Sequence, residues 1–310
     1  MSEEPPPLIT IVTPCLNRRD TIAESVESVL AQGVAPVEHI VTDGGSTDGT
    51  LDILARYPDL RVVSEPDRGL YDAINKGIRL ARGGIVGLLN SDDVYAPGAL
   101  QAAVAALSAD PSLDMVCGGV EVFADVEDGT TKVLSRVNSA RVKRLRETDI
   151  VSGLPLTNGR FFRRTVFHRI GEFDLRFPVA ADRDFLLRAL LAGLRIGILP
   201  DIVYRYRSHP GSLTFGGEAG RERYLREYLG VATVRSREEP PGSPAWRAYR
   251  RWRAWAAGYL ALYLASRRHL AEAAAIVAAT FRDDALWVGR FLRQGAAHLR
   301  ERGLRRWSET

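Results

Sequence analysis

Two adjacent carboxylates, Asp92 and Asp93, follow a short apolar run in the segment IVGLLNSDD. Taken alone, this segment suits a solvated turn or a helix cap. Asp43 and Asp67 also lie just after apolar runs, however. Four carboxylates that meet in one crevice repel one another unless a cation joins them. Carboxylate oxygens favour Mg²⁺ or Mn²⁺, which often bridge proteins to substrate phosphates, so the pattern predicts a nucleotide-diphosphate ligand.

These carboxylates need a scaffold that brings their loops together, and the first 120 residues predict one. Short apolar runs alternate there with segments of helical periodicity. The expected strands cover 8–13, 37–43, 60–65, 85–89 and 114–123, and the expected helices cover 20–33, 70–82 and 97–107. This alternation indicates βαβ units and a mainly parallel sheet. Ligands bind outside the carboxyl ends of such strands, so the polar loops should form one site.

Further elements are expected from boundary signals and from the second half of the chain. Thr21 and Glu24 have the spacing of a capping box, and Gly33 fits a helix stop. The later expected elements are a basic helix near 139–147, a strand edge at 161–164, a helix over 182–193, and Ala/Arg/Trp-rich helices after a Pro-rich linker at 237–244.

The composition is that of an ordinary globular chain. Of its 310 residues, 45% are apolar and 26% are charged, which suits one large domain or two smaller ones. The formal charge is only +4, and no nucleic-acid-binding motif accompanies it, so we expect no nucleic-acid partner. After residue 245, arginine outnumbers acidic residues more than twofold and lysine is absent.

The compartment is predicted from cysteine usage and from the N-terminus. Cys15 and Cys117 lack metal-ligand spacing and are expected to be buried thiols in a reducing compartment. The segment MSEEPPPL is acidic and Pro-rich, unlike a signal peptide, and no apolar run is long enough to span a bilayer. We therefore expect a cytoplasmic protein, with contact at the inner face of the cell membrane left open.

Five segments resemble the family 2 glycosyltransferases with the GT-A fold, especially the bacterial enzymes that build cell-surface polysaccharides. In chain order they are TIVTPCLNRRDTIAESVESVLAQ, VEHIVTDGGSTDGT, SEPDRGLYDAINKGI, GLLNSDD and AADRDFLLRALLAG. The resemblance covers roughly residues 8–215. It implies a Rossmann-like, mainly parallel sheet flanked by helices, a nucleotide-diphosphate sugar as donor, and Mn²⁺ or Mg²⁺ as cofactor.

The resemblance also implies which residues contact the donor. They lie in the loops that follow the strands: Thr13, Pro14, Asn17, Asp43, Asp67, Arg68, Gly69, Asn90, Ser91, Asp92 and Arg207. Asp43 would receive the nucleobase. Residues 46–50 are expected mainly to form a turn and cap a helix. Asp72, Asn75 and Lys76 would lie beside the cleft, although an amphipathic helix with a charged face also explains them.

The segment NSDD corresponds to the family's DXD-type metal element, with Asn90 at the first acidic position. Asn90 adds no charge, so metal binding would fall to Asp92, with Asp93 as a further candidate; their order is left open. His209 is a third candidate for the metal, against the alternative of a solvated loop histidine. Arg207, in the same loop, would pair with phosphate oxygens.

Inverting transfer needs a general base that takes the proton from the acceptor hydroxyl. The family carries it in an acidic pair at a helix start, and this chain has Ala181-Asp182 there. Asp182 is therefore the candidate base, against the alternative of a helix N-cap. Asp184 lies four residues before Arg188, so an ion pair explains it, and it ranks second.

The C-terminal segment WRAYRRWRAWAAGYLALYLASRRHL has aromatic residues at helical spacing. They are Trp252, Trp255, Tyr259 and Tyr263. Two interpretations explain this stripe. We favour packing against the following helix in a hairpin, and the alternative is an interfacial helix on anionic lipid. A polyprenyl-linked acceptor would make peripheral membrane contact useful.

Together these features predict a GT-A domain over 1–215 and a helical extension over 216–310. The expected activity is inverting transfer from a UDP-, dTDP- or GDP-sugar to a saccharide or polyprenyl-linked acceptor. Two alternatives stay open. One is a nucleotidyltransferase on a related fold, which TPCLNRRD disfavours because it lacks glycines. The other is a nucleotide-sugar-binding protein with weakened catalysis, suggested by Asn90 and Ala181.

Overall fold

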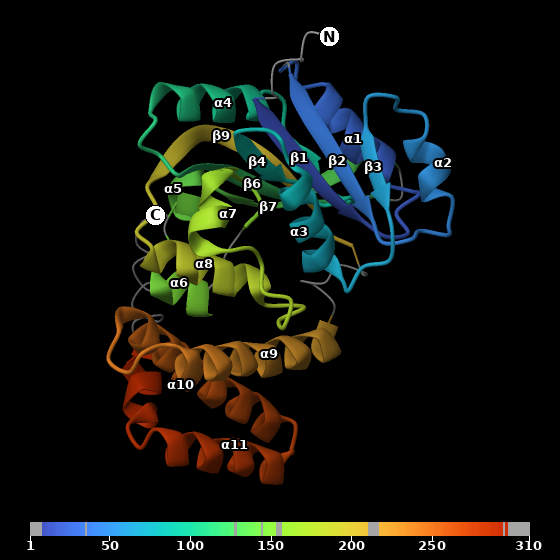
Figure 1. Ribbon diagram of the computed structural model, residues 1–310. Coiled ribbons are helices and arrows are strands. Elements are labelled where there is room, and N and C mark those ends of the chain that lie inside the picture. The colour runs from blue at the N-terminus through green and yellow to red at the C-terminus, as the bar shows by residue number, and fades with distance from the viewer. Residues whose placement is uncertain are drawn as a thin grey trace, which may run out of the picture. The chain divides into compact units, whose positions relative to one another are not determined.

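The computed structural model describes residues 8–34, 36–126, 129–143, 145–152, 157–209, 217–293 and 295–296 (Figure 1). Contacts divide the chain into two compact units. We call residues 1–144, 156–181 and 192–209 the sheet unit, and residues 145–155, 182–191 and 210–310 the helical unit. The domain boundary expected at residue 215 stays a prediction, because two earlier segments group here with the C-terminal helices.

The sheet unit contains the candidate site. Its strands are β1 (Ile9–Cys15), β2 (Val37–Asp43), β3 (Arg61–Ser64), β4 (Ile85–Leu88), β5 (Val94–Tyr95), β6 (Met115–Asp125), β7 (Thr131–Val137), β8 (Arg160–Arg163) and β9 (Ile196–Arg207). Its helices are α1 (Ile22–Leu30), α2 (Thr50–Leu54), α3 (Leu70–Leu80), α4 (Ala99–Ala109), α5 (Ser139–Lys143) and α7 (Thr165–Ile170).

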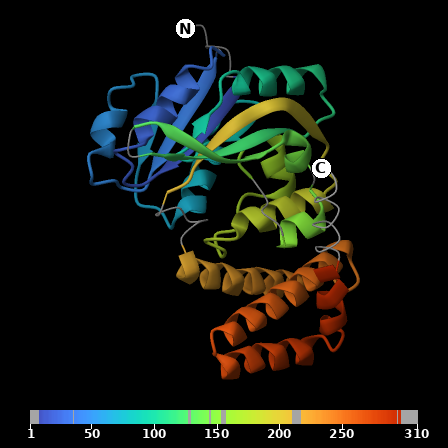
Figure 2. The same cartoon turned by 180° about the vertical axis from the view of Figure 1, so that it is seen from behind.

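Within the described residues, the strands form one sheet in the order β3-β2-β1-β4-β8-β6-β9-β5, with β7 on β6 (Figures 1 and 2). β1 pairs in parallel with β2 and β4, and β2 with β3. β8 is antiparallel to both of its neighbours, β4 and β6, whereas β6 and β9 are parallel. The expected mainly parallel sheet flanked by helices is therefore confirmed.

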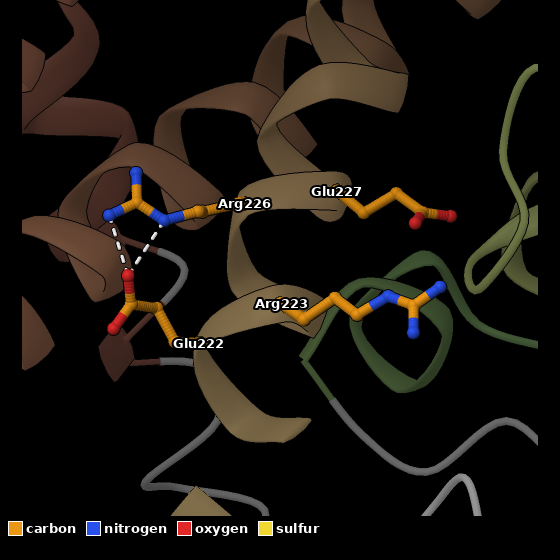
Figure 3. A pocket seen from close by; sticks show the side chains of 4 residues that line it. All are labelled: Glu222, Arg223, Arg226 and Glu227. Carbon is orange, nitrogen blue, oxygen red and sulfur yellow. Dashed lines mark hydrogen bonds and ion pairs between the residues drawn. The ribbon is translucent and has the colours of Figure 1, made fainter. Parts of the chain in front are cut away.

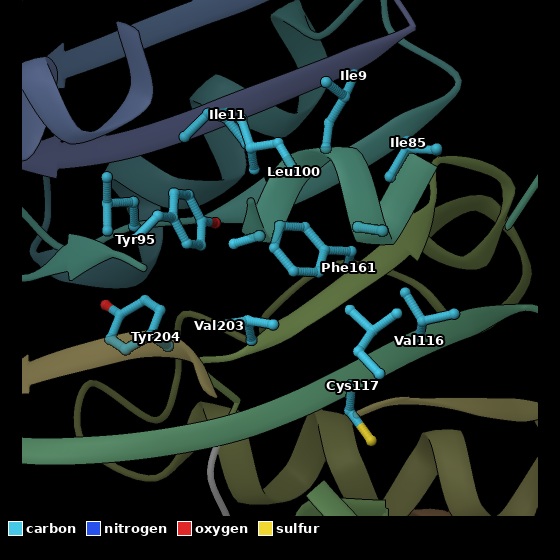
Figure 4. Close-up of a cluster of buried hydrophobic side chains, with 14 of the residues drawn as sticks. Ile9, Ile11, Ile85, Tyr95, Leu100, Val116, Cys117, Phe161, Val203 and Tyr204 are labelled. Atoms are coloured by element: carbon cyan, nitrogen blue, oxygen red, sulfur yellow. The ribbon is translucent and has the colours of Figure 1, made fainter. Parts of the chain in front are cut away.

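Alternation along β1 explains how helices cover both faces of the sheet. Ile9 and Ile11 belong to a buried cluster with Leu100 of α4 (Figure 4). Val12 points to the other face, because side chains alternate along a strand. There a side chain on Gly77 of α3 would overlap Val12, so glycine is what lets this helix lie close to the sheet.

Strand ends place the site loops. The carboxyl ends of β1, β2 and β4 lead into loops at 16–21, 44–49 and 89–93. The short strand β5 then pairs antiparallel with the far end of β9, Val94 opposite Arg205 and Tyr95 opposite Tyr204. This pairing brings the segment after β4 beside the last residues of β9, which are remote in sequence.

The local expectations for the start of α1 and for residues 139–147 are wrong, and the strand edge expected at 161–164 is instead β8, an inner strand between β4 and β6. The capping box does not form: Thr21 Oγ1 donates to Ser91 O (2.9 Å) instead of capping α1, and Glu24 pairs with Arg207. The basic helix near 139–147 is instead two short helices, α5 and α6 (Glu147–Ser152). In the first case, long-range partners at the site take the side chains that local capping would use.

The helical unit contains α6, α8 (Ala181–Leu191, except its first residue), α9 (Gly217–Glu238), α10 (Pro244–Ser266) and α11 (Leu270–Asp283). Residues of the expected linker connect α9 to α10, and Ser243 caps α10 by accepting from Trp246 N (3.0 Å). α10 packs against both α9 and α11, with Leu260 and Leu264 in its core. None of the helices in the described ranges combines the length and hydropathy that a membrane crossing needs.

Candidate functional site

The loop after β4 holds Asp93 inward and fully buried. Asp93 Oδ2 accepts from Tyr204 Oη (2.7 Å) and Asn90 Nδ2 (3.0 Å), and Oδ1 accepts from the backbone N of Arg207 (2.7 Å). Burial, and then the neighbouring charge of Asp92, raise the pKa of Asp93 to about 7, although the three donors oppose this. Both oxygens of Asp93 are thus committed to the protein.

Asn90 is one of these donors, which gives its amide a role in the fold. Its backbone N also donates to Tyr204 Oη (3.2 Å), and Asn158 Nδ2 donates to the same oxygen (3.1 Å). The hydroxyl of Tyr204 therefore links three segments around Asp93. An acid at position 90 would replace a donor to Asp93 with a second negative charge.

Asp92 faces outward from the same loop. Its side chain is 18% exposed, and Oδ2 lies 3.0 Å from His209 Nε2 and 3.8 Å from Arg18 Nε. The structure thus brings together Asp92 and His209, two of the three predicted metal ligands, while Asp93 points into the protein. The carboxylate of Asp92 and the imidazole of His209 are groups that can ligate a cation, and the guanidinium of Arg18 can pair with an anionic ligand.

Arg207 fixes the backbone behind Asp92. Its Nε donates to Asp92 O (2.9 Å), Nη1 pairs with Asp125 (2.5 Å), and Nη2 pairs with Glu24. Burial alone would lower the pKa of this guanidinium, but the two carboxylates raise it. The predicted contact of Arg207 with phosphate stays a prediction, and it would require the buried guanidinium to leave these partners.

The loop after β2 is organised by Asp43, which is buried. Its carboxylate accepts from the backbone N of Gly45 and Ser46 (3.0 Å each), from Ser64 Oγ (2.6 Å) and from Ser46 Oγ. Burial alone would raise the pKa of Asp43, but the hydrogen bonds, first those from Ser46 and Ser64, lower it. Asp43 is therefore a charged anchor at the carboxyl edge of the sheet.

Asn17 ties the loop after β1 to this second loop. It adopts a left-handed backbone (φ 52°), its Oδ1 accepts from Thr47 N (2.9 Å), and its backbone N donates to Ser46 Oγ (2.7 Å). Asp48 accepts from Thr50 N (3.0 Å) within the expected turn, but the N-cap position of α2 is Gly49 and no side chain caps the helix, so the expected cap does not form. The two loops thus form one hydrogen-bonded surface.

Asp67, Arg68 and Gly69 lie where α3 begins. Asp67 Oδ1 accepts from Gly69 N (2.8 Å), and its carboxylate lies so close to Gly44 that a side chain there would overlap it. Gly69 has φ 115°, a conformation that favours glycine. The guanidinium of Arg68, 74% exposed, pairs with Asp72 (3.1 Å). Asp67 therefore borders the loop that Asp43 anchors.

Several other predicted residues have side chains turned into the fold. Thr13 Oγ1 is buried against His39 Nε2 (2.9 Å), and Pro14 and Ser91 are also buried. Asn75 is a structural tie, since its amide both donates to and accepts from the backbone of Phe173 (2.8 and 3.1 Å). Lys76 pairs with Glu65 (3.0 Å), as a charged helix face predicts.

The two candidate bases on α8 differ sharply in their surroundings within the helical unit. Asp184 is fully buried and pairs with Arg188 (2.9 Å) and Arg235 (2.8 Å), and it accepts from Tyr249 Oη (2.8 Å). The expected ion pair to Arg188 is confirmed. Asp182 is only partly buried in the first turn, where Oδ1 accepts from Arg183 N (2.8 Å). Of the two carboxylates, only Asp182 is partly exposed, and its role as the base stays a prediction.

Sequence reasoning missed Tyr204, Glu24 and Asp125. Glu24 was assigned only to the capping box, and the site roles of all three depend on contacts between segments that are distant in sequence. A different feature, a surface hollow on α9, is lined by Glu222, Arg223, Arg226 and Glu227 (Figure 3). It contains none of the predicted site residues.

The model of glycosyl transferase family 2 matches residues 10–171, which is more than half of the chain, and the chain belongs to that family. An uncharacterized glycosyltransferase of Mycobacterium tuberculosis is 34% identical over 190 residues, which cover 60% of this chain and 70% of that protein. A PGL/p-HBAD biosynthesis glycosyltransferase of Mycobacterium bovis is 32% identical over 189 residues, covering 59% and 69%.

Solved structures share the GT-A fold. Staphylococcus aureus TarS 1–349 in complex with UDP-GlcNAc has a TM-score of 0.59 at 20% identity, covering 79% of this chain and 70% of that one. The mannosyltransferase PcManGT from Pyrobaculum calidifontis, in complex with GDP-Man and Mn²⁺, has a TM-score of 0.57 at 23% identity, covering 99% and 87%. The family resemblance and the fold expected from the sequence are confirmed.

Proposed function

We propose that this chain transfers a sugar, with inversion, from a nucleotide-diphosphate sugar to a saccharide or lipid-linked acceptor in surface-polysaccharide synthesis. Family membership supports glycosyl transfer, and the complexes of TarS with UDP-GlcNAc and of PcManGT with GDP-Man support this class of donor. The observation that carries the proposal is Asp92, an accessible carboxylate beside His209 and Arg18, held by a buried network at the carboxyl edge of the sheet.

The donor nucleotide would lie across the loops after β1, β2 and β3. The anchor Asp43 and the tie between Asn17 and Thr47 hold these loops together, and Asp67 and Gly69 border them. The nucleobase would meet the edge that Asp43 shapes, with Thr13, Pro14 and Ser91 shaping the cleft from within the fold. Both a uracil-type base and guanine remain candidates for this edge.

The residues present fit a divalent cation that the substrate completes. Within the described residues, no three His, Cys, Asp or Glu side chains are grouped closely enough to hold a metal by themselves. Mg²⁺ and related ions commonly bind through one or two carboxylates together with substrate phosphates. Asp92 and His209 would hold Mn²⁺ or Mg²⁺. Both oxygens of Asp93 are already hydrogen-bonded, so Asp93 would not bind the cation but would fix the loop that carries Asp92. When bound, the cation stabilises the charge that develops on the leaving diphosphate.

Asp182 would serve as the general base. It would accept the proton of the acceptor hydroxyl as that oxygen attacks the anomeric carbon and the bond to the diphosphate breaks. Its partial exposure supports this role, whereas the two arginines and the tyrosine around Asp184 make that carboxylate structural. A reducing, cytoplasmic compartment is consistent with the buried free thiols of Cys15 and Cys117.

A binding protein with weakened catalysis was suggested by Asn90 and Ala181. The hydrogen bond from Asn90 to Asp93 gives the amide a structural reason, and Ala181 is fully buried at the start of α8. Neither residue therefore marks a lost function by itself. The nucleotidyltransferase alternative has no support, since the family is one of glycosyl transfer.

Thermal shift with UDP, dTDP and GDP, each with and without Mn²⁺, tests donor binding. We expect one base to stabilise the chain in the presence of Mn²⁺, and Asp92→Asn to abolish this shift. Asp52→Asn, which changes an exposed carboxylate on α2, is the matched control and should keep it. Metal-dependent nucleotide binding that survives Asp92→Asn would refute the metal assignment.

Turnover tests the base separately from binding. Asp182→Asn should keep the Mn²⁺-dependent thermal shift but lower nucleotide-sugar transfer or hydrolysis by at least about 100-fold, the usual contribution of a general base. If Asp182→Asn turns over at the parent rate, Asp182 is not the base. If the parent binds donors but shows no transfer with any acceptor or water, the weakened-catalysis alternative holds instead.

A further inference from the structure

An apolar stripe runs along α11 on its solvent side. Leu270, Val277 and Phe281 are 65%, 40% and 55% exposed. With Ala274 and Ala278 they recur at intervals of three or four residues, which places them on one face of the helix. We call these five residues the α11 stripe. It contains no charged or polar side chain.

The α11 stripe is not the face that packs on α10. That contact uses the neighbouring seam of α11, where Ala273 and Ile276 join the cluster around Leu260 and Leu264 of α10. Thr280 continues the seam and is also buried. The stripe therefore has no partner among the described residues of the helical unit, and further exposed apolar side chains, Leu286 and Leu292, follow α11 in the chain.

Two acidic residues of α11, which lie outside the stripe, form ion pairs with arginines of neighbouring helices. Glu272 pairs with Arg226 of α9 (2.8 Å), and Asp283 pairs with Arg253 of α10 (2.5 Å). The solvent-facing side of an ordinary surface helix carries charged and polar residues. α11 differs, because one exposed face is entirely apolar and two of its acidic residues are neutralised by ion pairs.

Positive charge flanks both ends of the stripe. Arg267 and Arg268 lie exposed in the turn just before Leu270, and Arg282 lies exposed just after Phe281. Amphipathic helices with an apolar face and flanking arginines lie in the plane of anionic membranes, the apolar face among acyl chains and the cations at phosphates. The charge at the stripe thus complements an anionic lipid surface.

We propose that the α11 stripe docks the chain on an anionic lipid surface, with α11 lying in the membrane plane. From the sequence, α10 is the helix considered for membrane contact, because of the spacing of its aromatic residues. In the structure, Trp252 is fully buried and so cannot contact lipid. Trp255 and Tyr259 stack on each other, with ring centroids 5.7 Å apart. The proposal concerns where the chain binds and holds whether or not the proposed transfer reaction occurs.

Vesicle co-sedimentation of the full chain tests the proposal. We expect binding to vesicles of phosphatidylcholine with 30% phosphatidylglycerol, on the order of tenfold weaker binding to phosphatidylcholine alone, and weakening by salt. The triple change Leu270→Ser, Val277→Ser and Phe281→Ser should reduce binding to anionic vesicles at least about tenfold. Arg268→Gln with Arg282→Gln should reduce it only for anionic vesicles.

A matched control and an oligomer measurement make the test decisive. Leu30→Ser with Leu134→Ser removes exposed leucines from the sheet unit and should leave binding unchanged. Circular dichroism and melting temperature confirm that each variant is folded. Parent-like binding by the triple variant, or no binding by the parent, overturns the proposal. A parent that is dimeric by light scattering, and monomeric after the triple change, would assign the stripe to a second copy instead.

Discussion

Tyr204 donates a 2.7 Å hydrogen bond from Oη to Oδ2 of Asp93, across 111 positions of the chain. The β5–β9 pairing sets this contact, because it places Tyr95 opposite Tyr204 and so brings the residue before β5 beside the tyrosine hydroxyl. The consequence is that the inner carboxylate of the NSDD segment belongs to the protein interior, which leaves Asp92 as the carboxylate that faces outward.

At pH 8, where Asp93 is mainly ionised, Tyr204→Phe should destabilise the chain by about 1.5–3 kcal/mol. It removes the hydrogen bond to this carboxylate and also takes the hydroxyl acceptor away from Asn90 N and Asn158 Nδ2. Tyr95→Phe is a matched control: it also removes a buried hydroxyl, but one that donates to a neutral carbonyl, Leu88 O (3.1 Å). Its cost should be about 0.5–1.5 kcal/mol. The free energies of unfolding in urea measure both. Equal costs for the two variants would show that the contact with Asp93 carries no special weight.

Asn90→Asp restores an acid at the first position of the DXD-type element and should nevertheless harm the protein. The change removes a donor and places a carboxylate 3.0 Å from Asp93 Oδ2, in a buried setting where like charges are costly. We expect a loss of about 3 kcal/mol or more, compared with about 1–2 kcal/mol for Asn90→Ala. Unfolding in urea at pH 8 measures the free energy of unfolding of both variants and shows which change costs more. A variant Asn90→Asp that is as stable as the parent and binds Mn²⁺ more tightly would place residue 90 among the metal ligands.

The parts of the fold that follow from local patterns were predictable. The run VEHIVTD matches β2 residue for residue, and the strands around it were found to within two residues, because apolar β-branched runs between polar loops leave few alternatives. The positions of Asp43, Asp67 and Asp92 at or after the carboxyl ends of β2, β3 and β4 also follow from parallel pairing, which aligns these ends, whereas their convergence on one ligand stays a prediction.

The parts that failed depend on partners far along the chain. Nothing near Thr21 or Glu24 indicates that Ser91 and Arg207 will bind them, so a capping box was the natural interpretation. Likewise, Asn90 looks like a lost metal ligand until β5 and β9 pair and bring Tyr204 to Asp93. Local sequence determines propensity, whereas these contacts join residues that are 70 to 183 positions apart in the chain.

Arg207→Lys should weaken metal-dependent nucleotide binding more than it weakens the fold. A lysine ammonium cannot span Asp125, Glu24 and Asp92 O at once as the planar guanidinium does, so the backbone of Asp92 loses its support. We expect about tenfold weaker binding of a nucleotide diphosphate with Mn²⁺, or about 1.4 kcal/mol. Titration calorimetry measures it. Arg205→Lys, two residues earlier and paired with Glu121 (3.0 Å), is the control, and an equal loss there would contradict the prediction.

His39→Gln should change how stability depends on pH. Burial lowers the pKa of His39 to about 3, below the value of about 6.5 expected in the unfolded chain. Between these values the unfolded state binds the extra proton, so this histidine makes the parent less stable as pH falls below about 6.5. From pH 7.5 to pH 5.5 the parent should lose about 1.4 kcal/mol relative to His39→Gln.

The comparison isolates His39 because other groups titrate in both proteins. Asp93, whose raised pKa favours the folded state as pH falls from 7 towards 4, acts in the opposite direction but cancels in the difference between parent and variant. Glutamine keeps a polar partner for Thr13 Oγ1, which limits the change in packing. Urea unfolding of both proteins at the two pH values gives the difference directly. A stability difference that stays constant with pH would mean that the buried imidazole gains its proton without unfolding.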